Sequence, residues 1–188
     1  MHSELTPEEA SFLFEVEDQN TDAPQTATAI TFARLFGYAH RSNSDPLDFE
    51  IERGLREHAG LRSGYSTLMQ NMAIAYSNMA AAASSDEYPM RELGFYSLTL
   101  IEDHGDYFIE LVFDDADDEK VVADEIKDPN ALVFLGQNGD LLTYELGPLV
   151  KGVRMIILDD MATKDRRLLE LLRSTTTGIF LTSGDNED

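Results

Sequence analysis

The chain contains no cysteine among its 188 residues. This absence excludes disulfide bonds and thiolate-bound zinc, so the fold is indifferent to the redox compartment. Basic residues are scarce as well, because 14 Lys and Arg stand against 36 Asp and Glu, for a formal net charge of -22. Lys and Arg neutralise phosphates in nucleic-acid complexes, so this balance argues against direct binding of DNA, RNA or an anionic membrane.

Long apolar runs are also missing. No stretch approaches the roughly 18 apolar residues that a membrane-spanning helix needs. The chain begins with MHSELTPEEA, which is acidic where a secretory signal is basic and then apolar. These two absences favour a cytoplasmic location without membrane contact.

Apolar content is nevertheless ample, since hydrophobic residues make up 43% of the sequence, with ten Phe and seven Tyr. This composition is typical of a folded domain rather than of a disordered acidic tail. A chain of this length can form one core, or a small core with an appended helical segment.

The first part of the chain, residues 1–85, has the patterns of helices. The Thr6–Glu9 segment forms a T-x-x-E capping box. The three- and four-residue spacing of apolar side chains predicts four helices, at about 7–18, 27–41, 46–60 and 64–83, with Gly60 ending the third. Leu68, Met72, Ala75 and Met79 align on the fourth helix, which indicates core packing, with a Met-lined partner groove as the alternative.

The second part, residues 86–188, changes to strand patterns. We expect one hairpin from 93–101 and 107–113, a second from 131–135 and 141–146 around the Asn138–Gly139 turn, and a terminal strand at 178–181. The apolar run 153–158 is typical of a strand buried on both faces, and a helix at 162–174 follows it. This strand, helix and strand predict a right-handed crossover to a parallel neighbour.

These elements predict an α+β fold. In it, an N-terminal layer of about four helices packs on a mixed, mainly antiparallel sheet of five to six strands, with a C-terminal strand–helix–strand. The two parts, 1–85 and 86–188, form separate regions or one single domain, and the sequence leaves both arrangements open.

No motif predicts a catalytic or metal site. The acidic cluster at 114–119 fails the EF-hand pattern, because Ala116 occupies the third position and Glu119 the sixth. Asp159 and Asp160 are better explained as the cap of the following helix than as metal ligands of a hydrolase. The four histidines lack ligand spacing, and His40 and His58 are expected at the edge of the core. We therefore predict no cofactor, and we favour a non-enzymatic protein over an enzyme.

The charge distribution is the feature that points to a function. Between Glu102 and Asp128 there are twelve carboxylates and two lysines, a net charge of -10. Such a surface favours a basic protein partner, which this chain binds as a dedicated partner or as a nucleic-acid-mimicking inhibitor. The predicted binding residues are Asp103, Asp106, Asp114, Asp115, Asp117, Asp118 and Glu119.

Two alternatives to this prediction remain. In the first, the chain is a structural or assembly protein whose acidic residues are an adaptation to a saline environment. In the second, the chain is a divalent-metal-dependent hydrolase that uses the clustered aspartates. The C-terminal helix carries Lys164, Arg166, Arg167 and Arg173, which we interpret as balancing nearby acids, with an anion site as the alternative. The sequence does not determine the oligomeric state.

Overall fold

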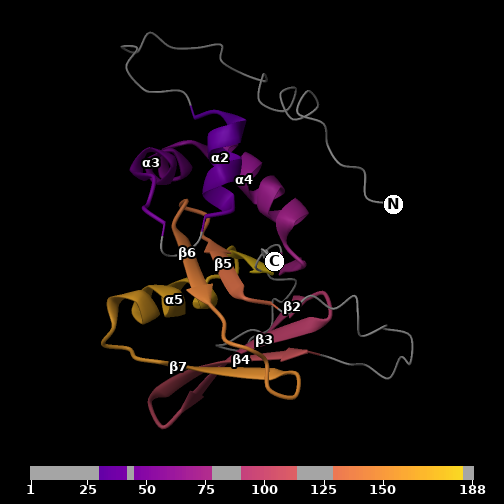
Figure 1. Cartoon of the computed structure of the whole chain (residues 1–188). Coiled ribbons are helices and arrows are strands. Elements are labelled where there is room, and N and C mark those ends of the chain that lie inside the picture. Colours follow the sequence, from indigo (N-terminus) through magenta and orange to yellow (C-terminus); the bar gives the residue numbers. More distant parts are fainter. Residues whose placement is uncertain (1–29, 42–44, 78–89, 114–128, 184–188) are drawn as a thin grey trace, which may run out of the picture. The chain divides into compact units, whose positions relative to one another are not determined.

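The computed structural model describes residues 30–41, 45–77, 90–113 and 129–183. In these residues the chain is α+β, with four helices and two antiparallel sheets of four strands each (Figure 1). It divides into two compact units, Met1–Leu68 and Met69–Asp188. The predicted α+β class is confirmed. The predicted helix at 7–18 and the predicted division at residue 85 fall outside the described residues.

The first unit contains the helices α2 (Phe32–Ala39) and α3 (Phe49–Glu57), and α4 (Ala59–Met72) begins in it. Side chains cap two of these helices, because Thr31 accepts a hydrogen bond from the backbone of Arg34 and Asp48 accepts two from the first turn of α3. Each helix buries one apolar face, with Leu35 on α2 and Ile51 on α3 fully buried. The predicted helices at 27–41 and 46–60 are thus confirmed in the described residues, with shifted ends.

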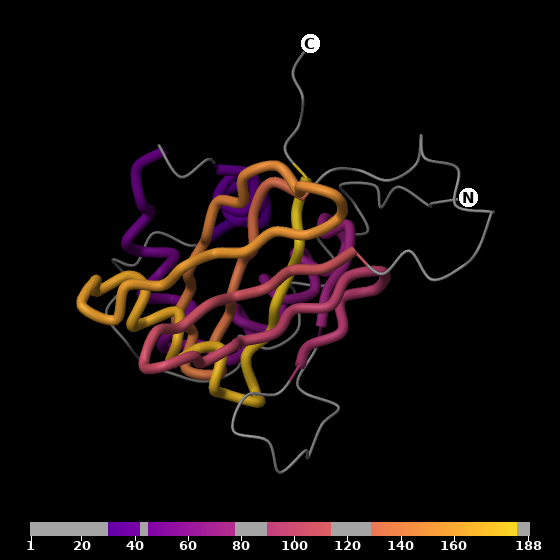
Figure 2. Tube along the Cα trace, turned by 90° about the horizontal axis from the view of Figure 1, so that it is seen from below, coloured from indigo at the N-terminus to yellow at the C-terminus, as the bar shows by residue number. Residues whose placement is uncertain are grey.

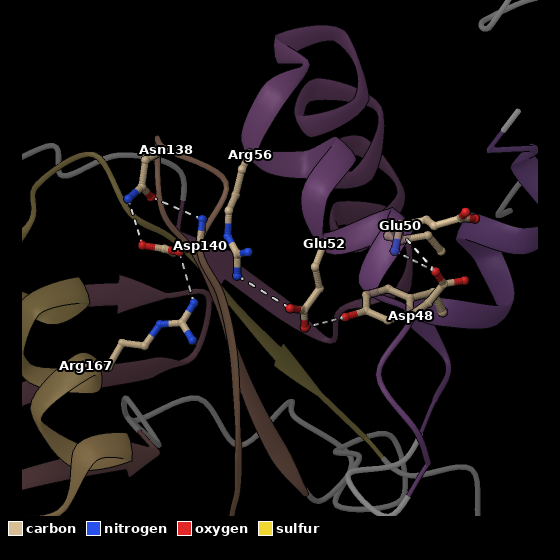
Figure 3. A network of polar contacts seen from close by, with 9 residues as sticks. Asp48, Glu50, Glu52, Arg56, Asn138, Asp140 and Arg167 are labelled. Carbon is tan, nitrogen blue, oxygen red and sulfur yellow. Dashed lines mark hydrogen bonds and ion pairs between the residues drawn. The ribbon is translucent and has the colours of Figure 1, made fainter. Parts of the chain in front are cut away.

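An ion-pair cluster links the start of α3 to α2. The Arg34 guanidinium donates to both carboxylate oxygens of Asp48, at 2.7 Å each, and forms a 2.7 Å ion pair with Glu50. Further along α3, Glu52 accepts from the Tyr38 hydroxyl at 3.1 Å and pairs with Arg56 (Figure 3). The hydrogen bond from Arg34 lowers the pKa of Asp48 below its ordinary value.

This pKa shift predicts a pH-dependent stability. A carboxyl group whose folded pKa is depressed stabilises the fold above its unfolded pKa, near 4, and loses that contribution as the pH falls through the folded value. We expect Asp48→Asn to cost about 0.5–1 kcal/mol at neutral pH, the range of a partly exposed ion pair. That difference should shrink as the pH falls below about 4, because protonation removes the charge of the wild-type carboxylate. Urea unfolding of both proteins across the acid range measures it, and a constant difference would contradict the assignment.

The fourth helix differs from its prediction at both ends. α3 stops at Glu57, and α4 begins only two residues later, so Gly60 lies inside a helix instead of ending one. After Met72 the chain forms a strand, β1 (Ala75–Ser77), in place of further helix. A tertiary pairing overrides the local helix pattern here, since β1 pairs with the C-terminal strand and the Ile74 amide donates to Leu181 at 2.8 Å.

The second unit is built from two four-stranded sheets. Sheet A has the order β1-β8-β5-β6 and sheet B the order β2-β3-β4-β7, and all neighbours are antiparallel. The remaining elements are β2 (Arg91–Leu93), β3 (Tyr96–Asp103), β4 (Asp106–Phe113), β5 (Ala131–Leu135), β6 (Leu141–Glu145), β7 (Val153–Leu158), α5 (Thr163–Arg173) and β8 (Gly178–Thr182).

The two sheets and α5 share one hydrophobic core. The inward side chains of both sheets meet four leucines of α5 in this core, and the strands of the two sheets run in crossing directions (Figures 1 and 2). Two aromatic contacts join α5 to both sheets, because Lys164 lies over the ring of Tyr144 in β6 and Arg173 over that of Tyr107 in β4.

Two predictions about the sheet are therefore wrong. The strands do not form one mixed sheet, and the C-terminal strand–helix–strand is not a crossover between parallel neighbours. β7 belongs to sheet B and β8 to sheet A, so α5 carries the chain from one sheet to the other. The physical reason is that each strand pairs with an antiparallel partner that is distant in the sequence. β7 pairs with β4, and β8 pairs with β5.

Tight turns explain the hairpins. Gly139 adopts φ 83° between β5 and β6, which confirms the turn expected from Asn138–Gly139. His104 and Gly105 both have positive φ, 53° and 92°, as a two-residue turn between β3 and β4 requires. A further turn at Gly94, with φ 60°, separates β2 from β3. The predicted strand 93–101 is therefore interrupted at its start.

None of the helices in the described segments is both long enough and apolar enough to cross a membrane.

Candidate partner-binding surface

The β3–β4 hairpin places two of the predicted binding residues next to each other. Asp103 and Asp106 are direct partners across the two strands, on either side of the His104–Gly105 turn. Both are exposed, with 67% of the Asp103 side chain accessible. Like charges in directly opposite positions destabilise an antiparallel pair, so this tip concentrates negative charge at a cost in stability.

Few positive charges counter this tip. In the described residues, the Nδ1 atom of the neighbouring His104 lies 2.5 Å from Oδ1 of Asp103, and the His104 side chain is 92% exposed. Among the described Lys and Arg residues, none forms an ion pair with Asp103 or Asp106. The tip therefore presents carboxylates that are open to a partner's basic groups.

The other five predicted residues, Asp114, Asp115, Asp117, Asp118 and Glu119, lie outside the described residues. The structure therefore brings together two of the seven predicted binding residues and leaves the other five as a prediction.

Three of the four basic residues of α5, Lys164, Arg167 and Arg173, each contact a described side chain. Arg167 forms a 3.0 Å ion pair with Asp140, and the Asn138 side chain donates to the same carboxylate (Figure 3). Arg173 lies in the last turn of α5, where a positive charge complements the helix dipole. These contacts agree with the interpretation that the helix balances nearby acids.

The predicted role of Asp159 and Asp160 as the helix cap is wrong in detail. α5 begins at Thr163, and its N-cap residue Ala162 makes no side-chain capping bond. Asp159 instead closes a turn, because its carboxylate accepts from the Met161 amide at 2.9 Å. Asp165 reaches back and accepts from the Asp159 amide at 2.9 Å. Met161 and Ala162 separate Asp160 from the first helical residue, Thr163, so neither aspartate occupies the N-cap position.

Candidate metal ligands do not gather in the described residues. These residues contain no group of three or more His, Asp or Glu side chains that could hold a metal ion. His40 and His58 lie exposed at the ends of α2 and α3, where they occupy C-cap positions, so their predicted place at the core edge is wrong. The His40 ring contacts Phe36, one turn earlier on α2.

The exposure of one face of β7 was not predicted. The run 153–158 is not buried on both faces, since Met155 is 50% and Ile157 71% exposed while Ile156 and Leu158 are buried. β7 therefore belongs to a sheet with one open face. We call this the outer face of sheet B, and it comprises Glu92, Ser97, Thr99, Ile101, Asp103, Asp106, Phe108, Glu110, Val112, Val153, Met155 and Ile157.

The outer face includes the acidic tip. Side chains alternate along a strand, so Asp103 lies on the same face as Ile101, and Asp106 on the same face as Phe108. Carboxylates and exposed apolar side chains thus share one surface. A continuous apolar run gives no sign of such exposure, because its pattern is equally that of a buried strand.

Comparisons with models of protein families, with curated proteins and with solved structures find no match to this chain.

Proposed function

We propose that this chain is a non-enzymatic interaction protein that binds a basic partner protein through the acidic surface of residues 102–128. The observation that carries the proposal is the net charge of -10 in this segment together with the exposed Asp103–Asp106 tip. No Lys or Arg of the described residues pairs with that tip.

The physical effect of such a surface is on encounter and specificity. Complementary fields raise the association rate and make binding sensitive to salt. A net charge of -22 also repels nucleic acid and other copies of the same chain. A nucleic-acid-binding protein is one partner with a basic surface, because its channel normally holds phosphates, which occur at about one charge per 1.7 Å of duplex axis. In that form the chain acts as an inhibitor, and otherwise as a dedicated partner.

The test compares two variants with the same net charge. In the first, the seven predicted binding residues are neutralised, Asp to Asn and Glu to Gln. In the second, the seven carboxylates between Met1 and Pro24 are neutralised in the same way. Both variants change the formal charge from -22 to -15, so a difference between them reports position and not total charge.

Each protein is used in a pulldown from which bound basic proteins are eluted with increasing salt. We expect the wild type and the N-terminal variant to retain the same basic partners, and the first variant to lose them. Equal retention by all three proteins would overturn the proposal, and so would a loss confined to the N-terminal variant.

A further inference from the structure

The outer face of sheet B carries a continuous apolar band. Ile101, Phe108 and Ile157 are partners in the register of β3, β4 and β7, so they form one row across three strands. Met155 and Val153 continue the band along β7. Ile157 is 71% and Met155 50% exposed. An apolar band of this kind on an exposed sheet face is typical of a surface that another element covers.

The width of the band fits a single helix. Neighbouring strands lie about 4.8 Å apart, so three strands span about 10 Å, which is close to the diameter of an α-helix with its side chains. In layered folds a sheet buries an apolar face against a helix in this way. β7 is also an edge strand of sheet B. Among the described strands, none lies next to β7 on the side away from β4, so the apolar band is open at that edge.

Charge decides which kind of helix the face can accept. Its twelve positions include four carboxylates, those of Glu92, Asp103, Asp106 and Glu110, and no Lys or Arg. Glu110 lies in the middle of the face, between Thr99 and Met155 in the register. No Lys or Arg of the described residues forms an ion pair with it. A covering helix must therefore bring basic side chains to Glu110 and to the acidic tip.

We propose that the outer face of sheet B binds an amphipathic, basic helix of a partner protein, with its apolar side on the Ile101–Phe108–Ile157 row. Its Lys or Arg residues face Glu110 and the Asp103–Asp106 pair. The inference rests on the proposed function and names the chemistry of the partner's contact. A second copy of this chain is a poor occupant, because it would bring further carboxylates to the same face.

The test uses the full chain and two peptides of Lys and Leu with identical composition. One peptide has Leu at helical i, i+3, i+4 and i+7 spacing, and in the other the order is scrambled. Fluorescence anisotropy measures both affinities. We expect the amphipathic peptide to bind the wild type at least about tenfold more tightly, as the burial of a few apolar side chains implies.

Two variants locate the contact. Met155→Thr with Ile157→Thr keeps residues that favour strands and should remove the preference, while the scrambled peptide binds as before. The matched control, Phe49→Thr with Met161→Thr, removes two side chains that are 75% and 78% exposed elsewhere and should keep the preference. Glu110→Gln should weaken the amphipathic peptide by about threefold, since it removes one charge pair. Thermal melts confirm that each variant is folded.

The outcomes separate this inference from the proposed function. Equal binding of both peptides by the wild type, lost when the seven acids are neutralised, would overturn the helix site and leave the proposed function standing. Equal binding of the amphipathic peptide by the wild type and by the seven-acid variant would overturn both the helix site and the proposed function. Self-association of the wild type that disappears in the Met155/Ile157 variant would assign the face to a second copy, and it would likewise overturn the proposal.

Discussion

Replacing Arg91 with alanine is expected to destabilise the fold by about 3 kcal/mol. The Arg91 side chain is only 2% exposed, on the inner side of β2. Its guanidinium donates to the backbone carbonyls of Ser174, at 2.5 Å, and Thr175, at 3.4 Å, at the end of α5. Hydrogen bonds to charged groups contribute about 1.5–3 kcal/mol, and the truncation also leaves a cavity.

The position of these carbonyls explains why a cation is buried here. Ser174 is the C-cap residue of α5, where the helix dipole places partial negative charge. Burial lowers the pKa of Arg91, but an arginine stays charged at neutral pH. The side chain therefore ties the β2–β3 hairpin of sheet B to the helix that leads into sheet A.

Two further variants of this region separate packing from hydrogen bonding. Arg91→Met keeps most of the volume and should cost about half as much as Arg91→Ala, because it loses the hydrogen bonds but leaves a smaller cavity. Glu92→Ala, at the exposed neighbouring position, should stay within about 0.5 kcal/mol of the wild type. Urea unfolding measures all three variants. Wild-type stability of Arg91→Met would show that the carbonyl contacts contribute nothing.

Replacing Phe134 with alanine is expected to have an effect of similar or larger size, about 3–5 kcal/mol. Phe134 is fully buried in β5, where its register partners are Leu142 of β6 and Ile179 of β8. It belongs to the core that both sheets share with α5. The loss combines the transfer of a large apolar side chain to water with the cavity that rigid neighbours cannot fill.

An exposed phenylalanine provides the matched control for Phe134. Phe95 is 64% exposed in the turn between β2 and β3, and Phe95→Ala should change the free energy of unfolding by less than about 0.5 kcal/mol. Thermal melts and urea unfolding of the two variants give the comparison. A cost below about 1 kcal/mol for Phe134→Ala would contradict its place in the centre of the core.

Local features of the fold were predictable from the sequence. The Asn138–Gly139 and His104–Gly105 turns form where glycine permits positive φ, and both hairpins pair as expected. The last helix lies within one residue of its predicted limits. These features depend on residues close together in the chain, so their pattern is written in the local sequence.

Half of the candidate site was predictable in the same way. The acidic residues on either side of a hairpin turn indicate that Asp103 and Asp106 lie together at its tip, and they do. The apolar half was not predictable, because Met155 and Ile157 belong to a run whose pattern is equally that of a buried strand. Their exposure follows from the absence of a covering layer among the described residues.

By itself, the sequence determined the α+β composition, the hairpin turns, the limits of the last helix to within one residue, and the concentration of negative charge. Only the tertiary structure decided that the strands divide into two antiparallel sheets, that Ala75–Ser77 is a strand and that β7 has an open face. The physical reason is the range of the interactions. Hairpin turns are decided by neighbouring residues, whereas the pairing of β1 with β8 depends on partners about a hundred residues apart, such as Ala75 and Leu181.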